Sequence, residues 1–129
     1  MSLTFELRDG ALRFVTVGDV DYATGLAVLR AGFGAAADAG PGKRWGLVFD
    51  IRSSSEDRNP DELRGIAAVI AGHRQLLTGR CSVLATDPLH YGLARMFGVF
   101  LETLGLESAA FRNPADAEAW LTTPPVGSW

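Results

Sequence analysis

The chain has only one cysteine, Cys81, among its 129 residues, so it cannot form an internal disulfide. Long apolar runs are also missing: the longest uncharged one, residues 65–72, is far shorter than the roughly 18 residues of a membrane span. The first residues show no basic stretch followed by an apolar run, so we expect no signal peptide. The single cysteine and the missing signal peptide predict a protein of the cytoplasm, a reducing compartment. The missing long apolar run predicts that it has no membrane span.

Neither sign of charge dominates, because 12 Lys and Arg residues stand against 15 Asp and Glu residues, a net charge of -3. This balance attracts neither phosphate backbones nor anionic lipids over distance, so we expect no nucleic-acid partner. Repeats, low-complexity linkers and blocks of like charge are absent as well. We therefore predict a single domain over residues 1–121, followed by a short tail over residues 122–129.

Two runs rich in β-formers, Leu3–Leu7 and Leu12–Val17, flank the pair Asp9-Gly10. Asp-Gly between alternating apolar residues is a strong signal for a hairpin, so we predict two antiparallel strands at the start of the chain. Further along, three short apolar runs at residues 45–51, 80–85 and 109–111 are typical of parallel strands that are buried on both faces.

An Asx-Pro pair follows each of these three runs: Asn59-Pro60, Asp87-Pro88 and Asn113-Pro114. Asn or Asp caps a helix, and proline presets φ at the first helical position, so each pair predicts a helix start. Periodic apolar residues predict another helix from Tyr22 to Ala36, begun by Asp19 or Asp21 and stopped by residues 40–42. For the helix after Pro60, the apolar stripe is expected to consist of Leu63, Ile66, Ala67, Ile70 and Leu77.

The elements follow one another as ββαβαβαβα. Because crossovers between parallel strands are right-handed, this order predicts an α/β fold with a mixed, mostly parallel sheet and an N-terminal β-hairpin.

The same order, with residues 83–88, Tyr91–Phe97, Ala110–Asn113 and Ala117–Leu121, resembles the SpoIIAA-like branch of the STAS/Sec14-like proteins. The resemblance covers nearly the whole chain, and the final Ala-x-x-Trp-Leu is its most specific part. It implies a β-α superhelix without a cofactor. It also implies a role in regulation by protein contact or, as in Sec14-type relatives, binding of apolar ligands.

One departure from that family pattern concerns a phosphorylation switch. Anti-sigma-factor antagonists carry an Asp-Ser-Ser-Gly turn with a phosphorylated serine at the second helix, where this chain has residues 59–62, Asn-Pro-Asp-Glu. Its own serines, Ser53, Ser54 and Ser55, come earlier and lie near four carboxylates. We therefore expect no constitutive phosphorylation there and little effect of Ser-to-Asp changes.

Gly32-Phe-Gly-Ala-Ala-Ala matches the G-x-G-x-x-G/A pattern of dinucleotide sites, and Asp50 follows downstream. That pattern requires a preceding strand, whereas the periodicity here places it inside a helix. The alternative is that small residues let this helix approach the sheet closely. We predict no nucleotide cofactor.

Metal and catalytic patterns are missing. His73, His90 and Cys81 stand at no spacing known for metal ligands or catalytic pairs, so we predict no metal and no catalytic residue, with Cys81 filling the core. The carboxylates Glu56-Asp57 and Asp61-Glu62 are interpreted as a solvated loop and as partners of a helix dipole.

The segment Arg52–Asn59 leaves the carboxyl end of a predicted parallel strand, the edge where open α/β sheets bind ligands. Its alternative is an ordinary solvated connection. We take five residues of this edge as a candidate loop for a ligand or partner: Arg52, Ser53, Ser54, Ser55 and Asp87.

The helix after Pro88 has apolar residues over roughly 200° of its circumference, whereas docking on a sheet needs only about 100°. The surplus predicts a second apolar contact: a homodimer, another partner or a ligand cavity. Met96, Phe97 and Phe100 are the candidates for that interface or apolar pocket. The alternative is that the last helix and the tail cover this surface.

These patterns together predict a non-enzymatic regulatory or protein-interaction domain of SpoIIAA/STAS type. The alternative is a small carrier of apolar, lipid-like ligands of Sec14-like type. The predicted partners are a second copy of the chain and an unidentified protein or apolar small molecule.

Overall fold

The computed structural model describes residues 1–123. They form one sheet and four α-helices, with a short 3-10 turn (Arg74–Leu76) before the fourth strand. In chain order the elements are β1 (Ser2–Arg8), β2 (Ala11–Gly18), α1 (Tyr22–Asp38), β3 (Trp45–Ser54), α2 (Pro60–Ala71), β4 (Leu77–Leu84), α3 (Pro88–Thr103), β5 (Glu107–Phe111) and α4 (Pro114–Thr122).

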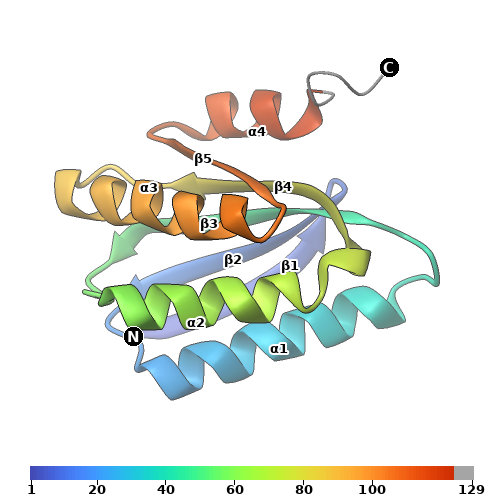
Figure 1. Ribbon diagram of the computed structural model, residues 1–129, viewed down its shortest axis with the longest axis horizontal. Coiled ribbons are helices and arrows are strands. Elements are labelled where there is room, and N and C mark those ends of the chain that lie inside the picture. The colour runs from blue at the N-terminus through green and yellow to red at the C-terminus, as the bar shows by residue number, and fades with distance from the viewer. Residues whose placement is uncertain (124–129) are drawn as a thin grey trace.

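The five strands are ordered β1-β2-β3-β4-β5, so each strand pairs with its neighbour in the chain (Figure 1). β1 is antiparallel to β2, and the other three pairs are parallel. The predicted element order and the mixed, mostly parallel sheet are confirmed.

The hairpin turns at Asp9 and Gly10, which both have positive φ, 51° and 76°. A two-residue turn with these angles matches the right-handed twist of the strands it joins. In the resulting register Phe5 stands opposite Phe14. The hairpin therefore brings its large apolar side chains to one face, as its sequence predicts.

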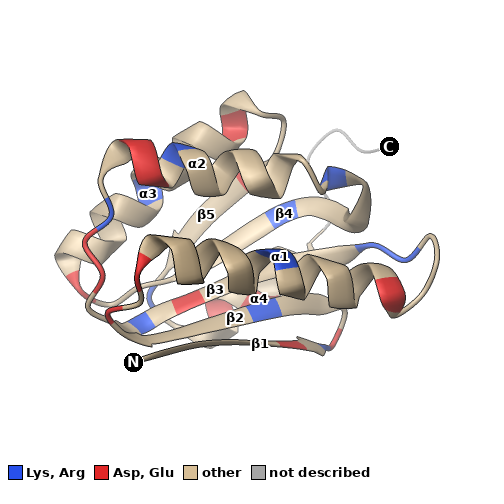
Figure 2. Ribbon diagram, turned by 90° about the horizontal axis from the view of Figure 1, so that it is seen from below, with Lys and Arg blue, Asp and Glu red and all other residues tan. Residues whose placement is uncertain are grey.

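Helices cover both faces of the sheet. Successive strand residues point to opposite faces, and those of one set, including Leu12, Leu47 and Val83, pack with α1, α2 and α3 in the larger core cluster. The alternate residues Ala11, Val48 and Leu84 pack against Ala117 of α4. Figure 2 accordingly shows α1 and α2 in front of the sheet and α4 behind it.

The predicted helix starts are confirmed in detail. The Asn59 side chain accepts a hydrogen bond from the Glu62 N–H, and Glu62 reaches back to the Asn59 N–H, which completes a capping box. The side chains of Asp87 and Asn113 likewise accept hydrogen bonds from the first turns of α3 and α4, without a reciprocal bond, and each is followed by proline. Asp21 stands at the N-cap position of α1 but makes no side-chain capping bond.

Two boundaries differ from the prediction. Leu77 does not belong to the apolar stripe of α2, because that helix ends at Ala71 and Leu77 instead begins β4, paired with Trp45. The residue is nevertheless buried, since the strand delivers it to the same core. β3 runs on to Ser54, so the first three residues of the expected loop after residue 51 are strand.

The Gly32 pattern lies inside α1, as the periodicity indicates. A Cβ atom at Gly32 would lie 2.6 Å from Phe14 Cζ, so only glycine lets the helix approach the sheet here. A Cβ atom at Gly34 would meet no atom of another element within 4 Å. The first glycine of the pattern therefore serves packing.

The first two residues of the expected tail belong to α4: Thr122 is its last residue and Thr123 is its C-cap. Residues 124–129 lie outside the described residues. Between residues 1 and 123, no helix has the length and apolarity required to cross a bilayer.

Candidate functional site

A cavity of about 120 Å³ lies between the sheet and the first turns of α1, α2 and α3. It is located at the carboxyl ends of the parallel strands, the edge where open α/β sheets bind ligands. Two small residues, Gly25 of α1 and Ala94 of α3, help to leave this space. Its apolar wall includes Leu26, Leu29, Phe49, Ile51, Leu63, Ile66, Val83, Leu93 and Phe97.

An ion pair between Glu56 and Arg58 lines the same cavity. Arg58 Nη2 lies 2.5 Å from Glu56 Oε2 and 2.5 Å from the Val20 carbonyl oxygen, and both charged side chains are about 15% exposed. Glu56 also accepts a hydrogen bond from the Val20 N–H at 3.2 Å. These contacts tie the loop after β3 to the start of α1.

The environment of Glu56 acts on its pKa in two directions. Burial raises the pKa of this carboxyl, whereas Arg58 and the Val20 N–H favour the charged form; the net direction is upward. The prediction that Glu56 belongs to a solvated loop is therefore wrong, because the chain folds this loop back over the cavity.

His90 connects the same loop to α3. Its Nε2 donates a hydrogen bond to the Glu56 carbonyl oxygen at 2.7 Å, and its Nδ1 lies 3.9 Å from Asp87 Oδ1. Asp87 itself accepts from the Leu89 N–H at 2.8 Å and from the His90 N–H at 3.3 Å. Asp87 thus acts as a helix cap that lies beside the cavity lining.

The candidate serines are distributed over different environments. Ser54 lines the cavity, and its hydroxyl accepts a hydrogen bond from the Glu56 N–H at 3.1 Å. Ser53 and Ser55 are exposed, with the Ser55 N–H bound to the Gly18 carbonyl oxygen at 3.0 Å. Only one of the three serines is therefore part of the cavity.

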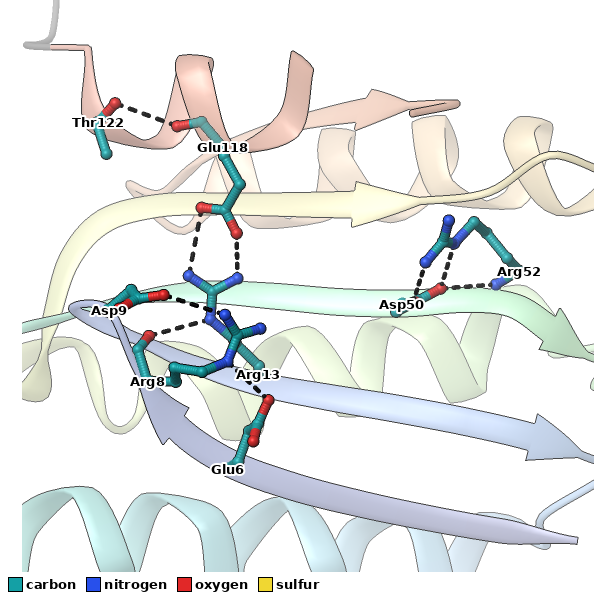
Figure 3. Close-up of polar contacts among 8 residues, drawn as sticks. All are labelled: Glu6, Arg8, Asp9, Arg13, Asp50, Arg52, Glu118 and Thr122. Atoms are coloured by element: carbon teal, nitrogen blue, oxygen red, sulfur yellow. Dashed lines mark hydrogen bonds and ion pairs between the residues drawn. The ribbon is translucent and has the colours of Figure 1, made fainter. Parts of the chain in front are cut away.

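Arg52 lies on the other face of the sheet. Its guanidinium binds both oxygens of Asp50, at 2.9 and 2.8 Å, on the side of the sheet that carries α4 (Figure 3). These hydrogen bonds lower the pKa of the Asp50 carboxyl. The structure therefore separates Arg52 from Ser54 and from the cavity.

The predicted apolar surplus of α3 is divided between core and surface. Phe97 is 6% exposed, packs edge-on against Phe49 and lines the cavity, so its position fits the predicted apolar pocket and not an interface. Phe100 is half-buried beneath the Arg64 guanidinium. Met96 is 39% exposed, and the neighbouring Leu89 and Val99 are 58% and 57% exposed.

Leu89, Met96 and Val99 stand seven and three residues apart, so they form one stripe along α3. We call these three residues the α3 stripe. α4 does not cover it, because that helix packs on the opposite face of the sheet. Met96 and Val99 border a groove whose other wall is the edge strand β5, at Ser108–Ala110.

The predicted site lacks the titratable residues that line the cavity: Tyr22, Glu56, Arg58 and His90. Glu56 accepts hydrogen bonds from the Val20 N–H and from His90, which lie 36 and 34 residues away from it in the chain. Their one signal in the sequence is the polar composition of residues 52–59, which contains Glu56 and Arg58.

The remaining titratable candidates lie apart from the cavity. His73 is bonded to the Val69 carbonyl oxygen and stacks on Phe33, and Cys81 is buried, which raises the pKa of its thiol. In the part of the chain that the structure describes, no group of three or more His, Cys, Asp or Glu side chains could hold a metal ion.

No family model matches this sequence, and no curated protein does either. Solved structures that are similar to it include the following two. One is an uncharacterised protein with a SpoIIAA-like fold from Shewanella loihica PV-4, with a TM-score of 0.57, 17% identity, and coverage of 93% of this chain and 92% of that one. The other is an anti-sigma factor antagonist from Mycobacterium paratuberculosis, with a TM-score of 0.59, 20% identity, and coverage of 95% and 94%.

At such low identity these similarities concern the fold. The chain has a SpoIIAA-like fold, and this confirms the resemblance carried by its strand-helix pattern.

Proposed function

We propose that this protein is a non-enzymatic regulatory domain of SpoIIAA/STAS type that acts in the cytoplasm through protein-protein contacts. The fold supports this proposal, and so does the similar structure from Mycobacterium paratuberculosis, which is named an anti-sigma factor antagonist. The observation that carries it is the α3 stripe, because three large apolar side chains lie exposed side by side on one helix. Full burial of one such side chain favours association by about 1.5–3 kcal/mol.

The partner that we propose for the α3 stripe is a second copy of the chain. Isologous pairing is the commonest way for one surface to be covered by its own copy. Of the residues that the sequence suggested for this contact, Met96 is exposed and is kept, whereas Phe97 belongs to the core. The exposed Val99 joins Met96 at the proposed contact.

Sedimentation velocity at tens of micromolar tests this contact. We expect a dimer for the wild type and a monomer for Val99→Glu, which places a charge in the stripe. Val17→Glu is the matched control, because Val17 is also exposed, at 44%, but lies on β2. A monomeric wild type, or a dimer that Val99→Glu leaves intact, would contradict the proposed homodimer.

A second candidate function is that of a small carrier of apolar ligands, and the cavity supports it. Native mass spectrometry of the purified protein tests this candidate. The expected result is an additional mass that disappears on denaturation.

A further inference from the structure

We propose that the cavity binds a compact, uncharged molecule with an apolar body and one hydrogen-bonding group, and that it excludes long-chain lipids. This inference rests on the second candidate function and names its class of ligand.

The size of the cavity sets the size of the ligand. An apolar cavity of about 150 Å³ holds a single benzene molecule, and the cavity here measures about 120 Å³. A single ring or a short branched chain therefore fills it. A long fatty acid or a diacyl lipid would have to leave most of its chain outside the cavity, in contact with water.

The wall of the cavity requires an apolar ligand body. Leu29, Phe49, Val83 and Phe97 line it from four different elements, and all four belong to the main core cluster or pack against it. A charged group placed among them would lose its hydration without gaining a partner, which is strongly unfavourable.

The polar side of the cavity favours a neutral head group. Glu56 and Arg58 form an ion pair there, so an anionic or a cationic head group would meet one like charge together with one opposite charge. Arg58 keeps donor capacity, because its Nη1 lies 3.9 Å from Glu62 Oε2, beyond hydrogen-bond distance. The Arg58 guanidinium also lies over the Tyr22 ring, which brings the Tyr22 side chain to the same place. A hydroxyl or carbonyl oxygen can accept from such donors without carrying a charge.

Three probes carry the same phenyl ring and differ in the charge of the head group: benzyl alcohol is neutral, benzoate is an anion and benzylammonium is a cation. Titrations of the ¹⁵N-labelled full chain, followed by amide chemical shifts, give the affinity of each. We expect benzyl alcohol to shift amides of residues that line the cavity and to bind about tenfold more tightly than either charged probe. Palmitate is expected to leave these amides unchanged.

Each opposite outcome has a distinct meaning. Tighter binding of benzoate or benzylammonium would overturn the neutral head group, and binding of palmitate at the cavity would overturn the size limit while leaving the carrier function in place. If no probe and no palmitate binds, both the inference and the carrier function fail.

A variant that fills the cavity locates the binding. Ala94→Leu adds side-chain volume inside it and is expected to weaken binding of benzyl alcohol about tenfold. Ala68→Leu is the matched control, since Ala68 is exposed on α2. Leu26→Phe fills the cavity from α1 and serves if Ala94→Leu does not fold, as judged by circular dichroism. Unchanged binding in a folded filling variant would overturn the assignment.

Discussion

The Tyr22 hydroxyl lies where a Cβ atom on Gly65 would clash with it, so the Tyr22 side chain of α1 packs directly against the backbone of α2. Tyr22 also lines the cavity and lies beneath the Arg58 guanidinium. This contact places the first turn of α1 against α2 and so sets one side of the cavity.

Gly65→Ala is therefore expected to destabilise the protein by about 1–3 kcal/mol, because the new methyl group forces the Tyr22 side chain away. Gly34→Ala is the control. Gly34 lies within α1, and a Cβ atom there would meet no atom of another element within 4 Å, so alanine should stabilise the protein by about 0.5–1 kcal/mol. Urea denaturation measures both. Combining Gly65→Ala with Tyr22→Phe, which removes the hydroxyl, should restore part of the loss; equal stability of the two alanine variants would contradict this account.

A second prediction concerns the ion pair between Arg13 of β2 and Glu118 of α4 (Figure 3). The Arg13 side chain is 8% exposed and also donates to the Arg8 carbonyl oxygen at 3.0 Å. Glu118→Ala would leave this buried guanidinium without its carboxylate, at a cost of about 1–3 kcal/mol in the free energy of unfolding. Glu6→Ala is the matched control, because Glu6 pairs with the exposed Arg8 and its loss should cost about 0.2–1 kcal/mol. Similar losses in the two variants would show that Arg13 finds another partner.

The third prediction follows from the raised pKa of Glu56. A carboxyl whose pKa is higher in the folded than in the unfolded state binds more protons when folded, so its contribution to stability falls as pH rises through the folded pKa. The stability of the wild type relative to Glu56→Gln should therefore decrease as pH rises through the range just above about 4.3, the ordinary glutamate value. Asp50 has a lowered pKa, so the stability of the wild type relative to Asp50→Asn should instead increase as pH rises toward about 3.9, the ordinary aspartate value. Urea denaturation over a pH series measures both differences, and slopes of the same sign would contradict the assignment.

The fourth prediction separates the three serines. Ser54→Asp places a carboxylate against Glu56, with which the Ser54 hydroxyl is hydrogen-bonded, and should destabilise the protein. Ser53→Asp and Ser55→Asp lie at exposed positions and should change stability by less than about 0.5 kcal/mol. The expectation from sequence, that all three changes are tolerated, is thus revised for Ser54. Thermal unfolding tests it, and equal melting temperatures for all three variants would restore the earlier expectation.

Phosphorylation of these serines is also disfavoured, because the nearby arginines already have carboxylate partners. Arg52 is bound to Asp50 and Arg58 to Glu56, so both cations are already paired with carboxylates. High phosphate occupancy at any of the three serines in protein from its native cells, measured by mass spectrometry, would contradict this prediction.

The order of elements and the helix starts could be predicted from the sequence because they depend on local chemistry. Asp9 and Gly10 set the hairpin turn through their own backbone angles, and Asn59 caps α2 by accepting a hydrogen bond from an N–H only three residues ahead. These interactions act within one turn, so the neighbouring residues are sufficient to indicate them.

The cavity was decided by tertiary structure. Val20, Glu56 and His90 are dispersed along the chain, and only the packing of α1 and α3 on one face of the sheet brings them together. The same holds for α3, whose broad apolar surface is evident in the sequence, whereas its division into a buried Phe97 and an exposed Val99 depends on how the helix is rotated against the sheet. Such a rotation is set by contacts between elements that are far apart in the chain, and the local sequence pattern does not determine these contacts.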